Sequence, residues 1–229
     1  MTKGHPPDDR SAPLDARERV QLCQRFEELG PDAPTLCEGW TTFDLAAHLA
    51  LRERNLLAGP GILLGDAVAP LGRLTDRLLA KEKERGYDRV VERVRTGPPF
   101  GPFAVPGLRT QINLVEYAVH HEDVRRANGM SPRSGVDDLQ DALWPLFTRL
   151  ARFVLRGVPD GVEVRLARPG GDEKVVARSG DRVVRVTGEP LEHLLWAYGR
   201  EAAAELEISA GRGATDDDVA AVRSAHLSI

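Results

Sequence analysis

The spacing of apolar residues changes near Gly157, from a helical period to a strand period. Before this point, apolar side chains recur every three or four residues, as Val20, Cys23 and Phe26 do. After it, residues 162–166 and 183–187 alternate apolar and polar side chains, which is typical of strands with one buried face. The sequence therefore predicts a helical part over residues 13–157 and an α+β part over residues 158–229. The fold class is α plus α+β.

The expected elements follow from this spacing and from the Gly and Pro residues between them. Helices are expected over residues 13–29, 41–57, 66–85, 108–128, 137–156, 190–204 and 216–224, with a shorter one from residue 88. Three short antiparallel strands are expected over residues 162–166, 175–178 and 183–187, and one more at 206–208. Thr41 and Asp44 resemble a capping box at the start of the second helix. Residues 1–12 are polar and rich in Pro, and we expect a disordered tail there.

Composition argues against several classes of protein. The 229 residues carry 31 basic and 35 acidic side chains, and the formal net charge of −4 does not favour nucleic acid or an anionic membrane as a partner. There is no apolar run of the ~18–20 residues that a transmembrane helix needs, and no apolar signal-peptide core follows Met1. Two cysteines, Cys23 and Cys37, are too few for a disulfide scaffold and suit a reducing compartment. We therefore expect a cytoplasmic protein, either a monomer or a homodimer.

Glu116, His120 and His48 are the residues most suggestive of chemistry. Glu116 and His120 lie four positions apart on a predicted helix, so both side chains project from one face and can reach one ion. Residues 112–119 are otherwise uncharged, and a carboxylate in such a stretch needs a counter-charge or a cation. His48 lies in the middle of another predicted helix, among Ala and Leu residues.

Together these three side chains offer two nitrogens and one oxygen, the donor set of a catalytic divalent-metal site with an open position. Zn²⁺ is the most natural ion, and Ni²⁺, Co²⁺, Fe²⁺ and Mn²⁺ are the alternatives. The residues alone leave two other interpretations open. Glu116 and His120 can form an ion pair on a solvated helix face, and His48 can be a hydrogen-bonded histidine of the core.

Three segments carry a resemblance to a known family. Residues 35–49 read TLCEGWTTFDLAAHL, residues 115–125 read VEYAVHHEDVR, and residues 188–200 read GEPLEHLLWAYGR. In this order and spacing they resemble the DinB-like metal-binding superfamily, in particular the actinobacterial branch that includes the mycothiol-dependent maleylpyruvate isomerases. The resemblance covers nearly the whole chain after the tail.

The resemblance implies both a fold and a site. It implies an N-terminal DinB-like four-helix bundle followed by a small, sterol-carrier-like α+β domain. His48, Glu116 and His120 would be three ligands of one divalent metal, and mycothiol would be the co-substrate whose thiol attacks an electrophilic small molecule. The resemblance also implies that Arg200, in the third segment, acts in catalysis from the second domain.

Arg52 and His121 are further candidates near the expected site. Arg52 follows His48 by one helical turn, and it can meet an anionic substrate or form a salt bridge with an acid such as Glu116. His121 points about 100° away from His120 around the helix, which suits contact with the ligands or packing rather than ligation. Cys23 lies on or near the buried face of its predicted helix, so we expect it to pack in the core, and we expect packing for Cys37 as well. The small-molecule thiol that the resemblance implies is consistent with this, because the chain would then need no catalytic cysteine.

We therefore expect a metal- and mycothiol-dependent transferase or isomerase. One alternative is a non-catalytic module that binds a metal or a small ligand, such as a sensor or a detoxification protein. Another is a helical bundle in which the three residues only form a polar core. The sequence does not identify the electrophile.

Overall fold

The computed structural model of the chain describes residues 11–54, 69–98, 108–171, 173–176 and 179–227. The chain divides into two compact units, Met1–Pro132 and Arg133–Ile229, and each is described by itself. Most of the predicted tail, and most of the Gly- and Pro-rich segments at residues 59–61 and 97–107, lie outside the described residues.

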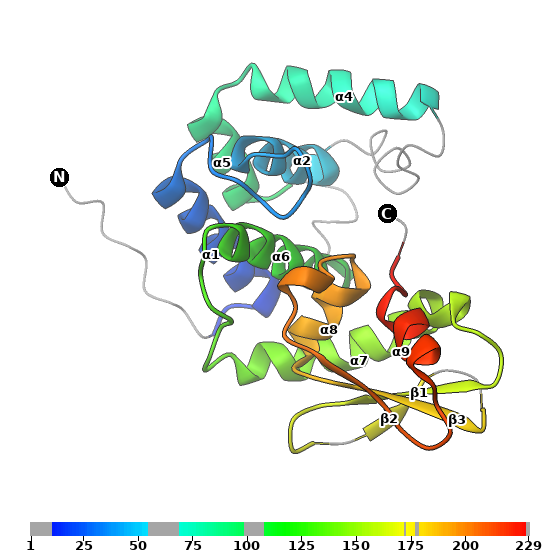
Figure 1. Ribbon diagram of the computed structural model, residues 1–229. Helices are drawn as coiled ribbons and strands as arrows, with labels where there is room; N and C mark the ends of the chain where they lie inside the picture. The colour runs from blue at the N-terminus through cyan, green and yellow to red at the C-terminus, as the bar shows by residue number, and fades with distance from the viewer. Residues whose placement is uncertain (1–10, 55–68, 99–107, 172, 177–178, 228–229) are drawn as a thin grey trace. The chain divides into compact units, whose positions relative to one another are not determined.

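The described part of the first unit is helical (Figure 1). Its elements are α1 (Leu14–Leu29), α2 (Thr42–Arg54), α4 (Ala69–Lys83), α5 (Tyr87–Thr96) and α6 (Leu108–Ala127). Helix α1 packs against α5 and α6, and α2 packs against α4 and α5. The helical N-terminal part that the apolar spacing predicts is therefore confirmed.

The start of α2 is fixed by two reciprocal hydrogen bonds. The Thr41 N–H donates to Asp44 Oδ2 (3.0 Å), and the Asp44 N–H donates to Thr41 Oγ1 (3.4 Å). This is the capping box that the spacing of the two residues predicts. Asp44 also accepts from Lys83 Nζ (2.6 Å), which ties the first turn of α2 to the end of α4. The helix that carries His48 thus has a defined beginning and a defined neighbour.

The core of the first unit lies between α1, α2, α5 and α6. It is built from side chains that these helices bury almost completely: Leu22, Cys23, Phe26, Leu45, Ala46, Ala47, Leu49, Ala50, Val90, Val91, Val94, Tyr117 and Val124. Small Ala residues flank His48 along α2, so neighbouring helices can approach its backbone closely. The position of His48 is therefore set by core packing.

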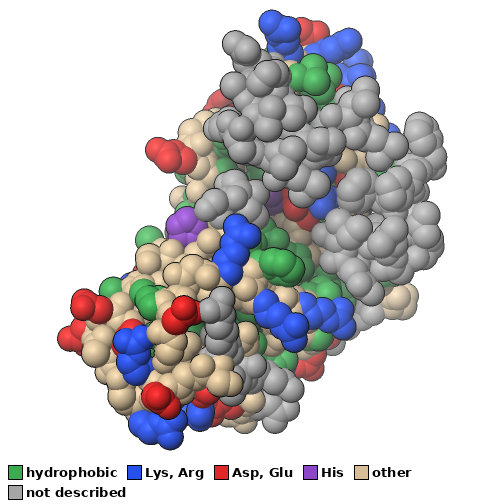
Figure 2. Space-filling view, turned by 90° about the vertical axis from the view of Figure 1, so that its right-hand side faces the viewer, with side chains coloured by type: hydrophobic (Ala, Val, Ile, Leu, Met, Phe, Trp, Pro, Cys, Tyr) green, Lys and Arg blue, Asp and Glu red, His purple; other side chains and the backbone are tan. Residues whose placement is uncertain are grey.

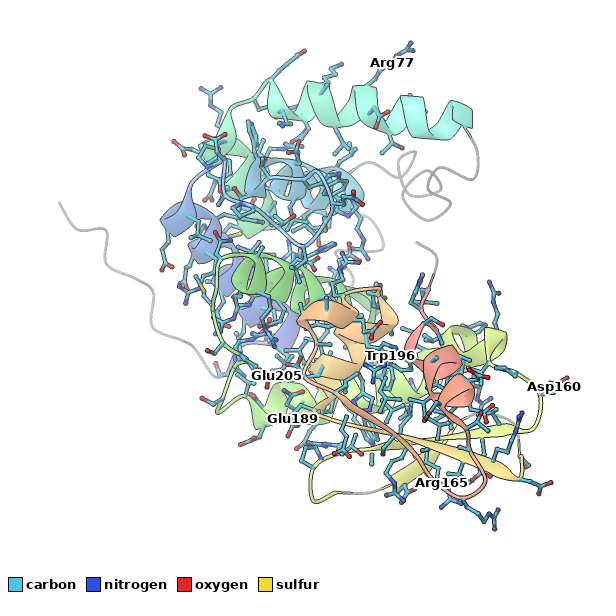
Figure 3. The ribbon with its side chains drawn as sticks, in the orientation of Figure 1. Arg77, Asp160, Arg165, Glu189, Trp196 and Glu205 are labelled. Atoms are coloured by element: carbon cyan, nitrogen blue, oxygen red, sulfur yellow. The ribbon has the colours of Figure 1, made fainter. Side chains whose placement is uncertain are left out.

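The second unit is α+β. Its elements are α7 (Asp137–Val154), η3 (Leu155–Gly157), β1 (Val162–Ala167), β2 (Glu173–Val175), β3 (Arg182–Thr187), α8 (Pro190–Ala197), η4 (Glu201–Ala203), β4 (Glu207–Ala210) and α9 (Asp216–Arg223). The strands form one sheet in the order β2-β1-β3-β4. Trp196 of α8 is buried and donates its Nε1–H to the carbonyl of Arg223 at the end of α9 (2.9 Å), so it joins the two helices (Figure 3).

The expectation of three antiparallel strands is wrong for one pair. β1 pairs with β2 and β3 with β4 in antiparallel fashion, but β1 and β3 are parallel, with Val162 opposite Arg182 and Ala167 opposite Thr187. The chain passes from β1 into the short strand β2 and then returns to the other edge of β1, where it runs in the same direction. Alternation in the sequence shows which residues share a face, but it does not determine which strand is the neighbour.

The division of the chain also differs from the expected boundary near residue 157, because α7 belongs to the second unit. Helix α7 packs against α8. Phe147 and Trp144 lie against the ring of His193, with ring centroids 5.0 and 5.5 Å apart, and Gln140 Oε1 accepts a hydrogen bond from the Leu191 N–H (2.9 Å). Helical spacing predicts α7 itself, but not which element covers its apolar face.

Among the described residues, no helix has both the length and the apolar character that crossing a bilayer requires. On the face drawn in Figure 2, basic and acidic side chains of the described residues lie interspersed.

Candidate metal centre

The structure brings His48, Glu116 and His120 together. His48 lies on α2, and Glu116 and His120 lie one turn apart on α6. Glu116 Oε1 is 3.3 Å from His48 Nε2 and 3.4 Å from His120 Nε2, and one ligand atom from each of the three residues lies within 4.8 Å of the other two. The rings of the two histidines are 5.5 Å apart and nearly perpendicular.

The spacing of these atoms matches the needs of a small divalent ion. With bonds of ~2.0–2.1 Å, two ligand atoms around a tetrahedral Zn²⁺ lie about 3.3–3.4 Å apart. Both measured separations from Glu116 Oε1 fall at that value. Two imidazole nitrogens and one carboxylate oxygen are also a donor set that divalent zinc and its neighbours accept. The residues present therefore fit a metal ion.

The site is largely buried but reachable. The side chains of His48, Glu116 and His120 are 11%, 19% and 13% exposed. Burial lowers the pKa of His48, and the contact with Glu116 does not reverse this, so its imidazole is neutral at neutral pH and one of its two ring nitrogens carries no proton. Burial would raise the pKa of the Glu116 carboxyl, but hydrogen bonds from His120 and His48 hold it well below its usual value. Both groups are thus held in the forms that a metal requires.

Asp123 and Cys37 support His120 from its other side. Asp123 Oδ2 lies 2.8 Å from His120 Nδ1 and accepts the Cys37 thiol at 3.3 Å, and the Asp123 side chain is fully buried. Burial would lower the pKa of His120, but the bonds to Asp123, Cys37 and Glu116 hold it well above its usual value. A carboxylate on Nδ1 directs the other ring nitrogen toward the ion, as in many zinc sites.

Sequence reasoning missed this role of Asp123. The interval of three residues from His120 places it on the same helix face, which was the available signal. Cys37, His120 and Asp123 also form a second group of neighbouring donor atoms, with Cys37 Sγ 4.0 Å from His120 Nδ1. Because Cys37 and His120 both face one oxygen of Asp123, this group is already connected by its own hydrogen bonds.

Arg52 contacts Glu116 directly. Its Nε lies 3.2 Å from Glu116 Oε1, and its Nη1 donates to Asn113 Oδ1 at 3.0 Å. Of the two roles left open by the sequence, the structure therefore places Arg52 in the salt bridge with Glu116. Trp40 is a further neighbour of the site, since its ring lies 5.1 Å from that of His48.

His121 faces away from the three residues, and Arg200 belongs to the second unit. His121 is buried between α6 and α1, where its Nδ1 lies 3.2 Å from Glu18 Oε2. One residue along a helix corresponds to ~100° of rotation, which turns His121 away from the face of His120. Arg200 lies in the second unit and donates from Nη1 to the carbonyl of Tyr198. A catalytic role for Arg200 stays a prediction.

The amino-acid sequence of the first unit was compared with known protein families. Residues 15–125 match the family model described as the mycothiol maleylpyruvate isomerase N-terminal domain. The match covers just under half of the 229 residues and shows that this helical segment is similar to that domain. The searches of curated proteins and of solved structures returned no match. The part matched to the isomerase N-terminal domain contains α2, α4, α5 and most of α1 and α6, and with them His48, Glu116, His120 and Asp123.

Proposed function

We propose that the first unit binds one divalent metal ion through His48, Glu116 and His120, and that the protein is a mycothiol-dependent transferase or isomerase. Zn²⁺ is the first candidate for the ion. The observation that carries the proposal is the convergence of two imidazole nitrogens and one carboxylate oxygen, from two helices, at the spacing of a tetrahedral ion. The proposal includes a DinB-like four-helix bundle in the first unit and a sterol-carrier-like second unit.

The chain's own residues would prepare the site. Asp123 holds the Nδ1 proton of His120, so that Nε2 is the nitrogen presented toward Glu116. His48 supplies a neutral nitrogen from the opposite helix because burial lowers its pKa. His120, whose pKa is raised, would lose its extra proton when the ion binds, so binding should release a proton below that pKa.

The charges of the surrounding residues favour an anionic partner for the ion. Glu116 and Asp123 each carry one negative charge, and Arg52 carries one positive charge. A divalent cation among them would leave one net positive charge, which a thiolate would balance. A divalent metal in such a position lowers the pKa of a bound thiol, so that the thiolate is available near neutral pH.

The thiol itself would come from a small molecule. Cys23 is fully buried, and burial raises the pKa of its thiol to about 12. Cys37 donates its thiol proton to Asp123. Neither cysteine is therefore presented as a free nucleophile. The family model that matches the first unit is named for mycothiol, which supports mycothiol as the source of the thiol. The second reactant would be an electrophilic small molecule.

Metal analysis tests the first half of the proposal. Protein purified without chelator should hold about one equivalent of divalent metal, and His48→Ala and His120→Ala should each remove most of it. His226→Ala, in an exposed part of the second unit, is the matched histidine control and should leave the content unchanged. If the parent protein is purified without metal and binds none of the added ions Zn²⁺, Co²⁺ and Ni²⁺, the metal proposal is wrong. The three residues would then only form a polar core.

Turnover tests the second half. The metal-loaded protein is mixed with a panel of small electrophiles and with mycothiol, glutathione or cysteine, and consumption of the thiol is followed. We expect turnover with mycothiol that falls at least tenfold in His48→Ala. Stoichiometric metal without thiol consumption across the panel would instead indicate a non-catalytic metal-binding module.

A further inference from the structure

A line of buried polar contacts runs from Glu116 into the core of the first unit. It connects α6, α2, α1 and the end of α5, and none of its members other than Glu116 belongs to the proposed ligand set. Starting at the site, it passes through Glu116, Arg52, Asn113, Glu53, Arg19 and the carbonyl of Val94. Each contact lies at hydrogen-bond distance, between 2.6 and 3.2 Å.

The inner end of this network is a buried ion pair between Arg19 and Glu53. Arg19 binds both carboxylate oxygens of Glu53, at 2.6 and 2.7 Å, and the two side chains are only 6% and 1% exposed. Arg19 also donates to the Val94 carbonyl at 2.8 Å and lies 4.7 Å from the centre of the Tyr117 ring. A buried, bidentate ion pair of this kind fixes the position of the Glu53 carboxylate.

The amide of Asn113 forms hydrogen bonds with both Glu53 and Arg52, and so connects them. Its Nδ2 donates to Glu53 Oε1 (2.9 Å), and its Oδ1 accepts from Arg52 Nη1 (3.0 Å). The reversed amide would set its oxygen against a carboxylate and its NH₂ against a guanidinium, and neither pair can form a hydrogen bond. The charge of Glu53 therefore selects the one orientation of Asn113 that can hold Arg52.

Arg52 in turn acts on the oxygen that faces both histidines. Its Nε contacts Glu116 Oε1 at 3.2 Å, and the same oxygen lies beside His48 Nε2 and His120 Nε2. A guanidinium that is held at Nη1 and contacts the carboxylate through Nε restricts rotation of the carboxylate about its last bond. The network thus joins a fixed charge in the core to the orientation of a proposed metal ligand.

We propose that Glu53 and Asn113 are positioning residues for the metal site: they hold Arg52, which orients the Glu116 carboxylate toward His48 and His120. This inference rests on the proposed function, because it assigns a role toward the same ion. It predicts that loss of the Glu53 charge weakens metal binding although Glu53 touches none of the three ligands.

The test compares two buried glutamates that pair across helices. Glu53→Gln removes the charge that orients Asn113, and Glu18→Gln removes the charge that faces His121 between α1 and α6. The dissociation constant for Zn²⁺ is measured by competition with a chelator, the Co²⁺-loaded proteins are compared by visible absorption, and the metal-free proteins are compared by thermal unfolding. Asn113→Ala is a second variant, and it tests the same positioning role if Glu53→Gln does not fold.

We expect Glu53→Gln and Asn113→Ala to bind Zn²⁺ about tenfold more weakly, at the lower end of the loss typical of residues that orient ligands, and to change the Co²⁺ spectrum. Glu18→Gln should lower the unfolding temperature but keep the parent affinity and spectrum. Two outcomes in which the parent binds Zn²⁺ would overturn the positioning role and leave the proposed function standing. In the first, all variants match the affinity and spectrum of the parent. In the second, Glu18→Gln weakens binding as much as Glu53→Gln does. If the parent binds no ion, the proposed function fails, and the positioning role fails with it.

Discussion

Asp123 accepts two hydrogen bonds at a single buried oxygen, from His120 Nδ1 and from the Cys37 thiol. The negative charge of the Asp123 carboxylate stabilises the proton on His120 Nδ1. An amide at this position would retain the shape but lose the charge, and its NH₂ group could turn toward the ring. The effect on the metal would come through His120, since Asp123 lies against Nδ1 and not against Nε2.

We predict that Asp123→Asn weakens Zn²⁺ binding about 10–100-fold, the loss typical of removing the partner of a ligating histidine. The dissociation constant is measured by competition with a chelator of known affinity. Asp44→Asn is the control, because Asp44 lies on the helix of His48 but pairs with Lys83. Parent affinity in Asp123→Asn would show that the carboxylate does not support the ligand.

The two cysteines differ in their environment. Cys23 is fully buried in the core, and burial raises its pKa to about 12, whereas Cys37 is partly exposed in the loop before α2. At pH 8 a thiol of that pKa is ionised in only ~1 molecule in 10,000, and the thiolate is the reactive form. We predict that iodoacetamide leaves Cys23 of the native protein unmodified and modifies it after unfolding in guanidinium. Peptide mass spectrometry reads both sites, and labelling of native Cys23 at the rate of the unfolded chain would contradict its burial.

Some residues of the site could be found from the sequence and others could not. Glu116 and His120 stand out because a spacing of four on a helix places them on one face, and His48 because it interrupts an apolar stretch. Glu53 and Arg19 do not stand out. Glu53 lies in a run of alternating Arg and Glu that looks like a solvated helix end, and its partner Arg19 is 34 positions away. Charged residues are expected at the surface, so only the three-dimensional structure reveals this buried pair.

Among the elements, the helices were easier to predict than the sheet. The predicted 13–29 and 108–128 compare with Leu14–Leu29 and Leu108–Ala127. These ends coincide with local signals: Gly30 and Gly129 follow the first and the second of these helices, with φ of 81° and 74°, which only glycine adopts readily. The parallel pairing of β1 and β3 has no such signal, because it depends on contacts between distant parts of the chain.

Helix α9 offers a test of a local signal in the second unit. The Thr215 Oγ1 accepts the Asp218 N–H (3.3 Å), and Asp218 Oδ2 accepts the Thr215 N–H (3.0 Å), a complete capping box. Without the hydroxyl, the Asp218 N–H at the start of the helix loses its partner. We predict that Thr215→Ala lowers the free energy of unfolding by about 1 kcal/mol.

The measurement is denaturant unfolding followed by circular dichroism. Ser224→Ala is the matched control, because Ser224 is exposed at the other end of the same helix and its hydroxyl donates only to the nearby Ala221 carbonyl. A loss of stability in the control equal to that of Thr215→Ala would mean that the capping box contributes nothing beyond a general effect of substitution.

At the scale of the whole molecule, each unit has its own buried core. In the first unit the core includes Leu22, Phe26 and Leu45, and in the second it includes Phe147 and Val164. The apolar spacing indicated two parts with different secondary structure, but it placed the boundary after α7 instead of before it. Hydrophobic spacing identifies a face that must be covered, and the partner that covers it is a property of the assembled fold.

The proposed metal ligands all belong to the first unit, so the ion should stabilise that unit and not the second. A ligand present at 100 times its dissociation constant adds about 2.7 kcal/mol to the stability of the state that binds it. For a unit of this size that corresponds to a rise of about 10 °C in unfolding temperature. We predict two transitions in calorimetry of the metal-free protein, of which saturating Zn²⁺ raises only one. The same transition should stay in place in His48→Ala, whereas His226→Ala should respond as the parent does. A single transition that Zn²⁺ shifts as a whole would show that the two units unfold together, and a shift that persists in His48→Ala would place the stabilising ion elsewhere.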